Sequence, residues 1–135
     1  MIREGSTAKS IAMLKKIISR GCPERVMLVT DDRHAEDIVA EGTWTTALRR
    51  AVEEGMDPVD AVRMVTLKPS EYFGLKSLGG ISPGKSAGMV IVDDMKRFNA
   101  RIVLIDGRLV ARDGNTCALW LRSGSFGWAG SILAA

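Results

Sequence analysis

The sequence predicts an α/β fold in its first part and a small antiparallel β region in its second. Residues 26–30 form a short, mainly apolar run that stops at two acids, which is typical of a parallel strand buried on both faces. Helical patterns surround this run within residues 1–75, as in a wound α/β protein. We expect a β-rich segment at 76–121 and then an apolar tail at 122–135, for which disorder and contact with a partner both stay open.

The first element is a helix expected over residues 7–20, with Ser6 as its cap and isoleucine and leucine side chains on one face. The strand at 26–30 follows, and then a short helical stretch at 36–40. A third helix is predicted over residues 45–54, where apolar residues again share one face.

Two more helices complete the first part. Asp57 and Pro58 form a strong helix start, because a capping carboxylate precedes a proline at the first helical position. This helix is expected to end near Thr66, and Pro69 begins a last short helix that Gly74 closes.

Glycine and proline become frequent after the last helix, and β-like stretches follow at 89–92, 101–105 and 109–111. The last two are joined by Asp106-Gly107, which is a strong signal of a two-residue hairpin turn. Residues 116–121 are predicted to add one more strand.

The composition is that of an ordinary globular domain, with 46% hydrophobic residues, 26% charged residues and a net charge of +3. The basic residues are spread beside acids, which argues against nucleic acid as a partner. Cys22 and Cys117 lack metal-binding spacing and are expected to be reduced thiols. We expect a cytoplasmic protein that does not engage a membrane, because the chain shows neither a signal-peptide pattern nor a membrane-length apolar run.

Asp31 and Asp32 are the candidate functional residues, because ligands of parallel sheets bind beyond the carboxyl ends of the strands. A carboxylate there can bind a divalent metal or accept a proton from a metal-bound water. Acids after strands are more often turn or cap residues, and the pattern alone favours that role. His34 is a ligand, a base or an exposed side chain, and a capping or helix-dipole role suffices for Glu4 and Ser6.

Several segments carry a more specific pattern, in a fixed order and spacing. They are residues 2–6 (IREGS), 28–34 (LVTDDRH), 41–42 (EG), 48–55 (LRRAVEEG), 61–69 (AVRMVTLKP), 71–75 (EYFGL) and 80–85 (GISPGK). Over roughly residues 1–114 the chain resembles the adenine deaminases of bacteria and archaea, which belong to the amidohydrolase superfamily.

The resemblance implies the last strand–helix units of a (β/α)8 barrel, followed by strands of a small β domain at 76–112. Such enzymes hydrolyse adenine to hypoxanthine and ammonia with a divalent metal, commonly manganese, iron or zinc. By position, Asp31 corresponds to the carboxylate that helps to hold the metal and shuttles protons. Asp32 corresponds to an acid beside it that either supports the metal-binding carboxylate or contacts the substrate. Glu4 and Ser6 correspond to residues near the substrate mouth, so adenine is the expected small-molecule partner.

Four departures from the family bear on activity. The chain has one histidine, whereas the family uses several histidines and a glutamate on earlier strands as metal ligands. Thr43 stands where the family usually has histidine, Gly88 where it usually has aspartate, and the match ends near Thr116. We therefore expect a fragment or truncated homologue of an adenine deaminase, inactive alone and without a retained metal.

Two other interpretations stay open. In one, the chain is a non-catalytic remnant that oligomerises or binds a small molecule or a protein; in the other, Asp31 is a turn acid only. The expected partners are a second copy of the chain or a missing N-terminal portion.

Overall fold

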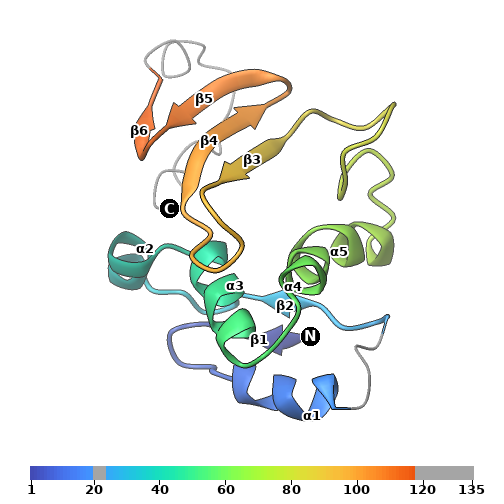
Figure 1. Cartoon of the computed structure of the whole chain (residues 1–135), viewed down its shortest axis with the longest axis vertical. Coiled ribbons are helices and arrows are strands. Elements are labelled where there is room, and N and C mark those ends of the chain that lie inside the picture. The colour runs from blue at the N-terminus through green and yellow to red at the C-terminus, as the bar shows by residue number, and fades with distance from the viewer. Residues whose placement is uncertain (20–23, 118–135) are drawn as a thin grey trace.

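The computed structural model describes residues 1–19 and 24–117, which form a helical region and a β region (Figure 1). The helical region contains a parallel pair of short strands, and the β region is an antiparallel sheet of four strands. The strands are β1 (Ile2–Arg3), β2 (Leu28–Val29), β3 (Met89–Val92), β4 (Ala100–Ile105), β5 (Arg108–Arg112) and β6 (Asn115–Thr116). The α/β class predicted from the sequence is confirmed.

The helices lie between and around these strands (Figure 1). They are the 3-10 turn η1 (Ile11–Met13) and the helices α1 (Leu14–Ile18), α2 (Ala35–Glu41), α3 (Trp44–Glu53), α4 (Pro58–Val65) and α5 (Leu67–Tyr72). None of the helices in the described ranges has the length and apolar character required for a membrane span.

The parallel pair places Ile2 opposite Leu28 and Arg3 opposite Val29. Ile2 and Leu28 are buried in the main core, whereas Arg3 is exposed and Val29 half-buried. Side chains alternate along a strand, so Arg3 and Val29 lie on the face of the pair that points away from this core. The predicted strand is in the right place but is shorter than expected, and only one of its faces is fully covered.

The main core joins the first strands, the helices and the β region. Leu14 of α1, Ala47 and Ala51 of α3, and Met64 of α4 are completely buried in it. The alanines let α3 approach its neighbours closely, because they present almost no side-chain volume. Phe98, in the β3–β4 connection, belongs to the same cluster and attaches the sheet to the helices.

The first helix is much shorter than predicted, and Ser6 does not cap it. Residues 4–10 form an ordered loop instead. In this loop the backbones of Glu4 and Lys9 form an isolated antiparallel β-bridge, and the Ser10 N–H donates to the Arg3 carbonyl at 2.8 Å. This loop uses backbone groups that a helix would need, so helical structure begins only at Ile11.

The helix start at Asp57 is confirmed. The Asp57 carboxylate accepts the N–H groups of Val59 at 2.9 Å and Asp60 at 3.2 Å, and Pro58 occupies the first turn of α4. These contacts satisfy two of the amides that a helix leaves unpaired at its N-terminus.

The β region follows the prediction closely. Asp106 and Gly107 have φ values of 49° and 73°, as a type I′ turn requires, and they join β4 to β5. β6 covers the beginning of the last predicted strand, and Cys117 follows it as a free thiol. The remainder of that strand, the apolar tail and Cys22 lie outside the described residues.

Candidate functional site

Two loops meet where β1 and β2 end. Because the strands are parallel, their carboxyl ends lie at the same edge, and residues 4–8 after β1 contact residues 30–34 after β2. The Glu4 N–H donates to the Val29 carbonyl at 2.8 Å, and the Ser6 N–H donates to the Asp32 carbonyl at 3.1 Å. All four residues predicted for the site therefore lie on these two loops.

Asp31 lies at this edge, on the face of the strand pair that points away from the core. It follows the end of β2 by two residues, and its ion pair with Arg3 places its carboxylate on the same face as Arg3 and Val29. Arg3 Nε lies 3.2 Å from the Asp31 carboxylate, and both side chains are about half exposed, at 59% and 44%. Asp31 has a φ of 56°, in the left-handed region that residues other than glycine seldom occupy.

Asp32 points toward the other loop. Its carboxylate accepts the Thr7 N–H at 3.1 Å and the Ala8 N–H at 3.3 Å. Desolvation acts to raise the pKa of Asp32, but the hydrogen bonds from Thr7 and Ala8 outweigh it and hold this pKa below its ordinary value of 3.8.

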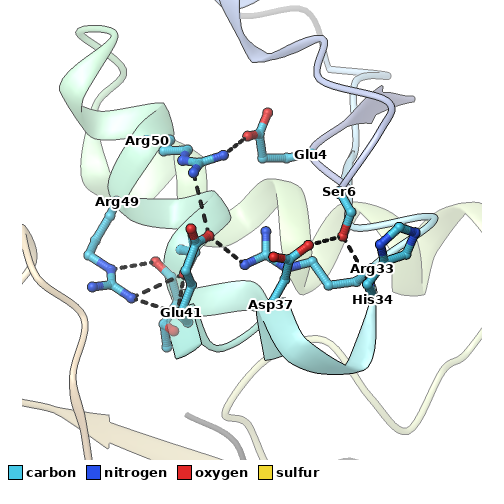
Figure 2. Close-up of polar contacts among 10 residues, drawn as sticks. Glu4, Ser6, Arg33, His34, Asp37, Glu41, Arg49 and Arg50 are labelled. Atoms are coloured by element: carbon cyan, nitrogen blue, oxygen red, sulfur yellow. Dashed lines mark hydrogen bonds and ion pairs between the residues drawn. The ribbon is translucent and has the colours of Figure 1, made fainter. Parts of the chain in front are cut away.

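Ser6 ties the first loop to α2 (Figure 2). Its hydroxyl donates to the Asp37 carboxylate and accepts the His34 N–H at 2.8 Å. The hydrogen bond from Ser6 and the positive charge of Arg33 lower the pKa of Asp37. The His34 backbone is therefore part of the site, while its side chain is exposed.

Gly5 lets the two loops approach each other. A Cβ at this position would overlap the Asp32 carboxylate and lie 2.7 Å from the Thr30 carbonyl oxygen, so any side chain would force the loops apart. Gly5 is buried, and the reason for a glycine here is space.

Glu4 belongs to a charge network that faces the helices (Figure 2). Its side chain is 1% exposed and pairs with Arg50 of α3, which also lies 3.5 Å from the Glu41 carboxylate at the end of α2. Glu41 in turn binds Arg33 at 2.8 Å, and the Arg33 side chain is 5% exposed. Within the described ranges, Glu4 Oε2 and Arg33 Nε are buried without a hydrogen-bond partner.

No local sequence pattern points to Arg33, Asp37, Glu41 or Arg50 as site residues. The Glu41-Gly42 pair and the arginines of α3 occur in the resemblance, but no local spacing connects them to Glu4. The contact between Glu4 and Arg50 spans 46 residues of sequence, and only the fold brings the two side chains together.

The described residues do not fit a metal centre by themselves. Within residues 1–19 and 24–117, no three His, Cys, Asp or Glu side chains are grouped so that they could hold a metal ion. The Asp31 carboxylate is paired with Arg3 instead. One carboxylate beside a guanidinium supplies too few ligands for the four- to six-coordinate sites of zinc or manganese.

Comparison with known proteins identifies the family of this chain. Residues 2–110 match the model of the amidohydrolase family, and the chain therefore belongs to that family. The adenine deaminase of Nitratidesulfovibrio vulgaris is 46% identical over 114 residues, covering 84% of this chain and 20% of that protein. The adenine deaminase of Methanothermobacter thermautotrophicus is 47% identical over 114 residues, with the same shares covered. The resemblance to adenine deaminases is thus confirmed, and the chain spans about a fifth of the length of these relatives.

Solved structures support the fold. The β-aspartyl dipeptidase of Fervidobacterium islandicum AW-1, solved with a β-Asp-Leu dipeptide, matches with a TM-score of 0.66 at 18% identity, over 84% of this chain and 33% of its own. An amidohydrolase from Thermotoga maritima matches with a TM-score of 0.55 at 23% identity, over 78% of this chain and 27% of its own. At these identities the likeness concerns the fold alone.

Gly5→Ala is expected to lower the free energy of unfolding by about 1–3 kcal/mol, since the new methyl group must displace Asp32 or the Thr30 backbone. Urea unfolding measures this change. Gly88→Ala is the matched control, because a Cβ there meets nothing within 4 Å, and it should change stability by less than about 0.5 kcal/mol. Equal effects of the two substitutions would contradict the close approach of the loops.

Acidification is expected to lower the stability of the folded chain through the carboxylates of the site. The pKa values of Asp32 and Asp37 are lowered in the folded chain from the ordinary value of 3.8. The stability that these carboxylates contribute is therefore complete at a pH well above 3.8, and it is lost as the pH falls through their folded-state pKa values. Melting temperatures between about pH 5 and pH 2 should therefore fall, and Asp32→Asn should reduce the fall. A melting temperature of the Asp32→Asn variant with the same acid dependence as the wild type would show that Asp32 contributes nothing.

Proposed function

We propose that this chain provides the last strand–helix units of the barrel, and part of the small β domain, of an adenine deaminase. The reaction is the hydrolysis of adenine to hypoxanthine and ammonia, carried out together with polypeptide outside residues 1–135. The metal of that centre (manganese, iron or zinc) and a cytoplasmic location belong to the same proposal. Its main support is that the loop bearing Asp31 and Asp32 meets the loop of residues 4–8 at the carboxyl edge of a parallel pair, in a chain whose matched relatives are named adenine deaminases.

Asp31 is the proposed catalytic and metal-binding residue. It is the one residue of the predicted set that lies with Arg3 on the face away from the core, which ligands carried by further strands would approach. The predicted substrate contacts stay predictions. Both Ser6 and Asp32 already use their side-chain oxygens within the chain, whereas Glu4 keeps one carboxylate oxygen without a hydrogen-bond partner among the described residues.

The open edges of the parallel pair support a role inside a larger sheet. Among the described residues, β1 and β2 pair only with each other, and one of their faces is only partly covered. Parallel strands are ordinarily buried on both faces, and a two-stranded sheet is marginal on its own. Additional strands on either side would complete the hydrogen bonding and bring the ligands that this chain lacks.

A chimera tests the proposal. When this chain replaces the matching segment of the Methanothermobacter relative, we expect ammonia release from adenine, and Asp31→Ala should reduce kcat by about 100-fold or more. Asp113→Ala is the matched control, because Asp113 also has a left-handed backbone (φ 48°) and pairs with an arginine, Arg101, at 2.9 Å. Equal activities of the two variants would contradict the role of Asp31, and ammonia release by the isolated chain would contradict its need for further polypeptide.

A non-catalytic remnant that oligomerises is the second candidate. It is favoured by a run of exposed apolar side chains from α5 into the following loop: Tyr72, Phe73, Leu75, Leu78 and Ile81. If these cover one another between copies, light scattering should give a single oligomeric mass that Phe73→Ser with Ile81→Ser reduces to that of one chain. A monomeric wild-type chain would exclude this candidate.

A further inference from the structure

The left-handed backbone of Asp31 does not belong to a hairpin turn, although the Arg33 N–H donates to the Asp31 carbonyl at 3.0 Å. Asp106 and Asp113 have similar φ values of 49° and 48°, but each precedes a glycine in a two-residue turn between antiparallel strands. Asp31 follows a parallel strand and precedes Asp32, so no hairpin imposes its conformation. A non-glycine residue in this region persists only where its surroundings hold it there.

Contacts on both sides of Asp31 provide that hold. Before it, the Val29 carbonyl accepts the Glu4 N–H at 2.8 Å. After it, the Asp32 carboxylate accepts the N–H groups of Thr7 and Ala8 at 3.1 and 3.3 Å, and the Asp32 carbonyl accepts a third amide from the same loop at 3.1 Å. Three consecutive amides therefore donate to one residue. The backbone is fixed at Val29 and at Asp32, and the conformation of Asp31 must connect these two points.

We propose that Asp32 is a positioning residue, which holds Asp31 in the left-handed conformation and so directs the Asp31 carboxylate toward the open face of the parallel pair. The Arg3 guanidinium, 3.2 Å from that carboxylate, marks the direction. Both carboxylate oxygens of Asp32 accept amide protons from Thr7 and Ala8, so this carboxylate is held by the neighbouring loop.

The proposed role differs from a direct contact with substrate in its kinetic consequence. Misplacing a catalytic carboxylate slows the reaction of bound substrate, whereas removing a binding contact weakens binding. The inference rests on the proposed function in this respect alone. The conformational claim concerns the isolated chain and does not depend on catalysis.

The first experiment measures the sign of φ at residue 31 by NMR couplings and backbone chemical shifts in the full 135-residue chain. We expect a positive φ in the wild type and its loss in Asp32→Ala, with the β3–β6 resonances unchanged as evidence of folding. Asp37→Asn is the matched control. It neutralises the carboxylate that accepts the Ser6 hydroxyl but leaves the amide hydrogen bonds to Asp32 in place, so φ at residue 31 should stay positive. If Asp32→Ala does not fold, Asp32→Ser, whose hydroxyl is too short to bind both amides, gives the same comparison. A positive φ in a folded variant without the Asp32 carboxylate overturns the proposal.

The second experiment uses the chimera. Asp32→Ala should lower kcat by about 100-fold with KM nearly unchanged, and Asp32→Asn, which keeps one acceptor oxygen, should recover part of the loss. A raised KM with unchanged kcat would assign Asp32 to substrate binding and overturn its positioning role. An inactive chimera in which φ at residue 31 still depends on Asp32 would count against the proposed function and leave the conformational claim intact.

Discussion

The amides of Ser6, Thr7 and Ala8 all donate to Asp32, and this convergence determines how the ends of the two parallel strands are arranged. The strands themselves are only two residues long, so their own hydrogen bonds cannot fix the loops that follow. Gly5 allows the close approach, and the Ser6 hydroxyl extends the contact to α2. The conformation of Asp31 follows from these contacts, and the candidate site depends on them.

The charge network behind the loops has a different character. Glu4 is almost fully buried, and its partner Arg50 also lies near Glu41, which binds Arg33. Removing one member of a buried ion pair is costly because the remaining charge keeps neither water nor a counter-ion. The network therefore joins the end of β1 to α2 and α3, on the side of the strands opposite to Asp31.

Local signals predicted the parts of the fold that local chemistry determines. Asp57 caps α4 through its own neighbours, and Asp106-Gly107 turns because of its own backbone preferences. The prediction of a long first helix was wrong, because the amides of residues 6–8 donate to Asp32, which is distant in sequence and lies in the second loop.

The candidate site was predicted in the same partial way. The sequence located Asp31 and Asp32 at a strand end, and their different environments arise from the ion pair of Asp31 with Arg3 and from the loop amides that bind Asp32. The pairing of Glu4 with Arg50 joins residues 46 positions apart, so neither periodicity nor spacing could indicate it.

The shared position of Arg50 between two carboxylates has a consequence for how this chain can vary. A substitution at Glu4 alone would leave Arg50 with a poorer set of partners, and a substitution at Arg50 alone would leave a carboxylate in the interior. Homologues that dispense with this charge pair are therefore expected to have replaced both residues together, by apolar side chains of similar volume. Evolutionary drift at residues 4 and 50 is then correlated, even though neither residue lies on the face that carries Asp31.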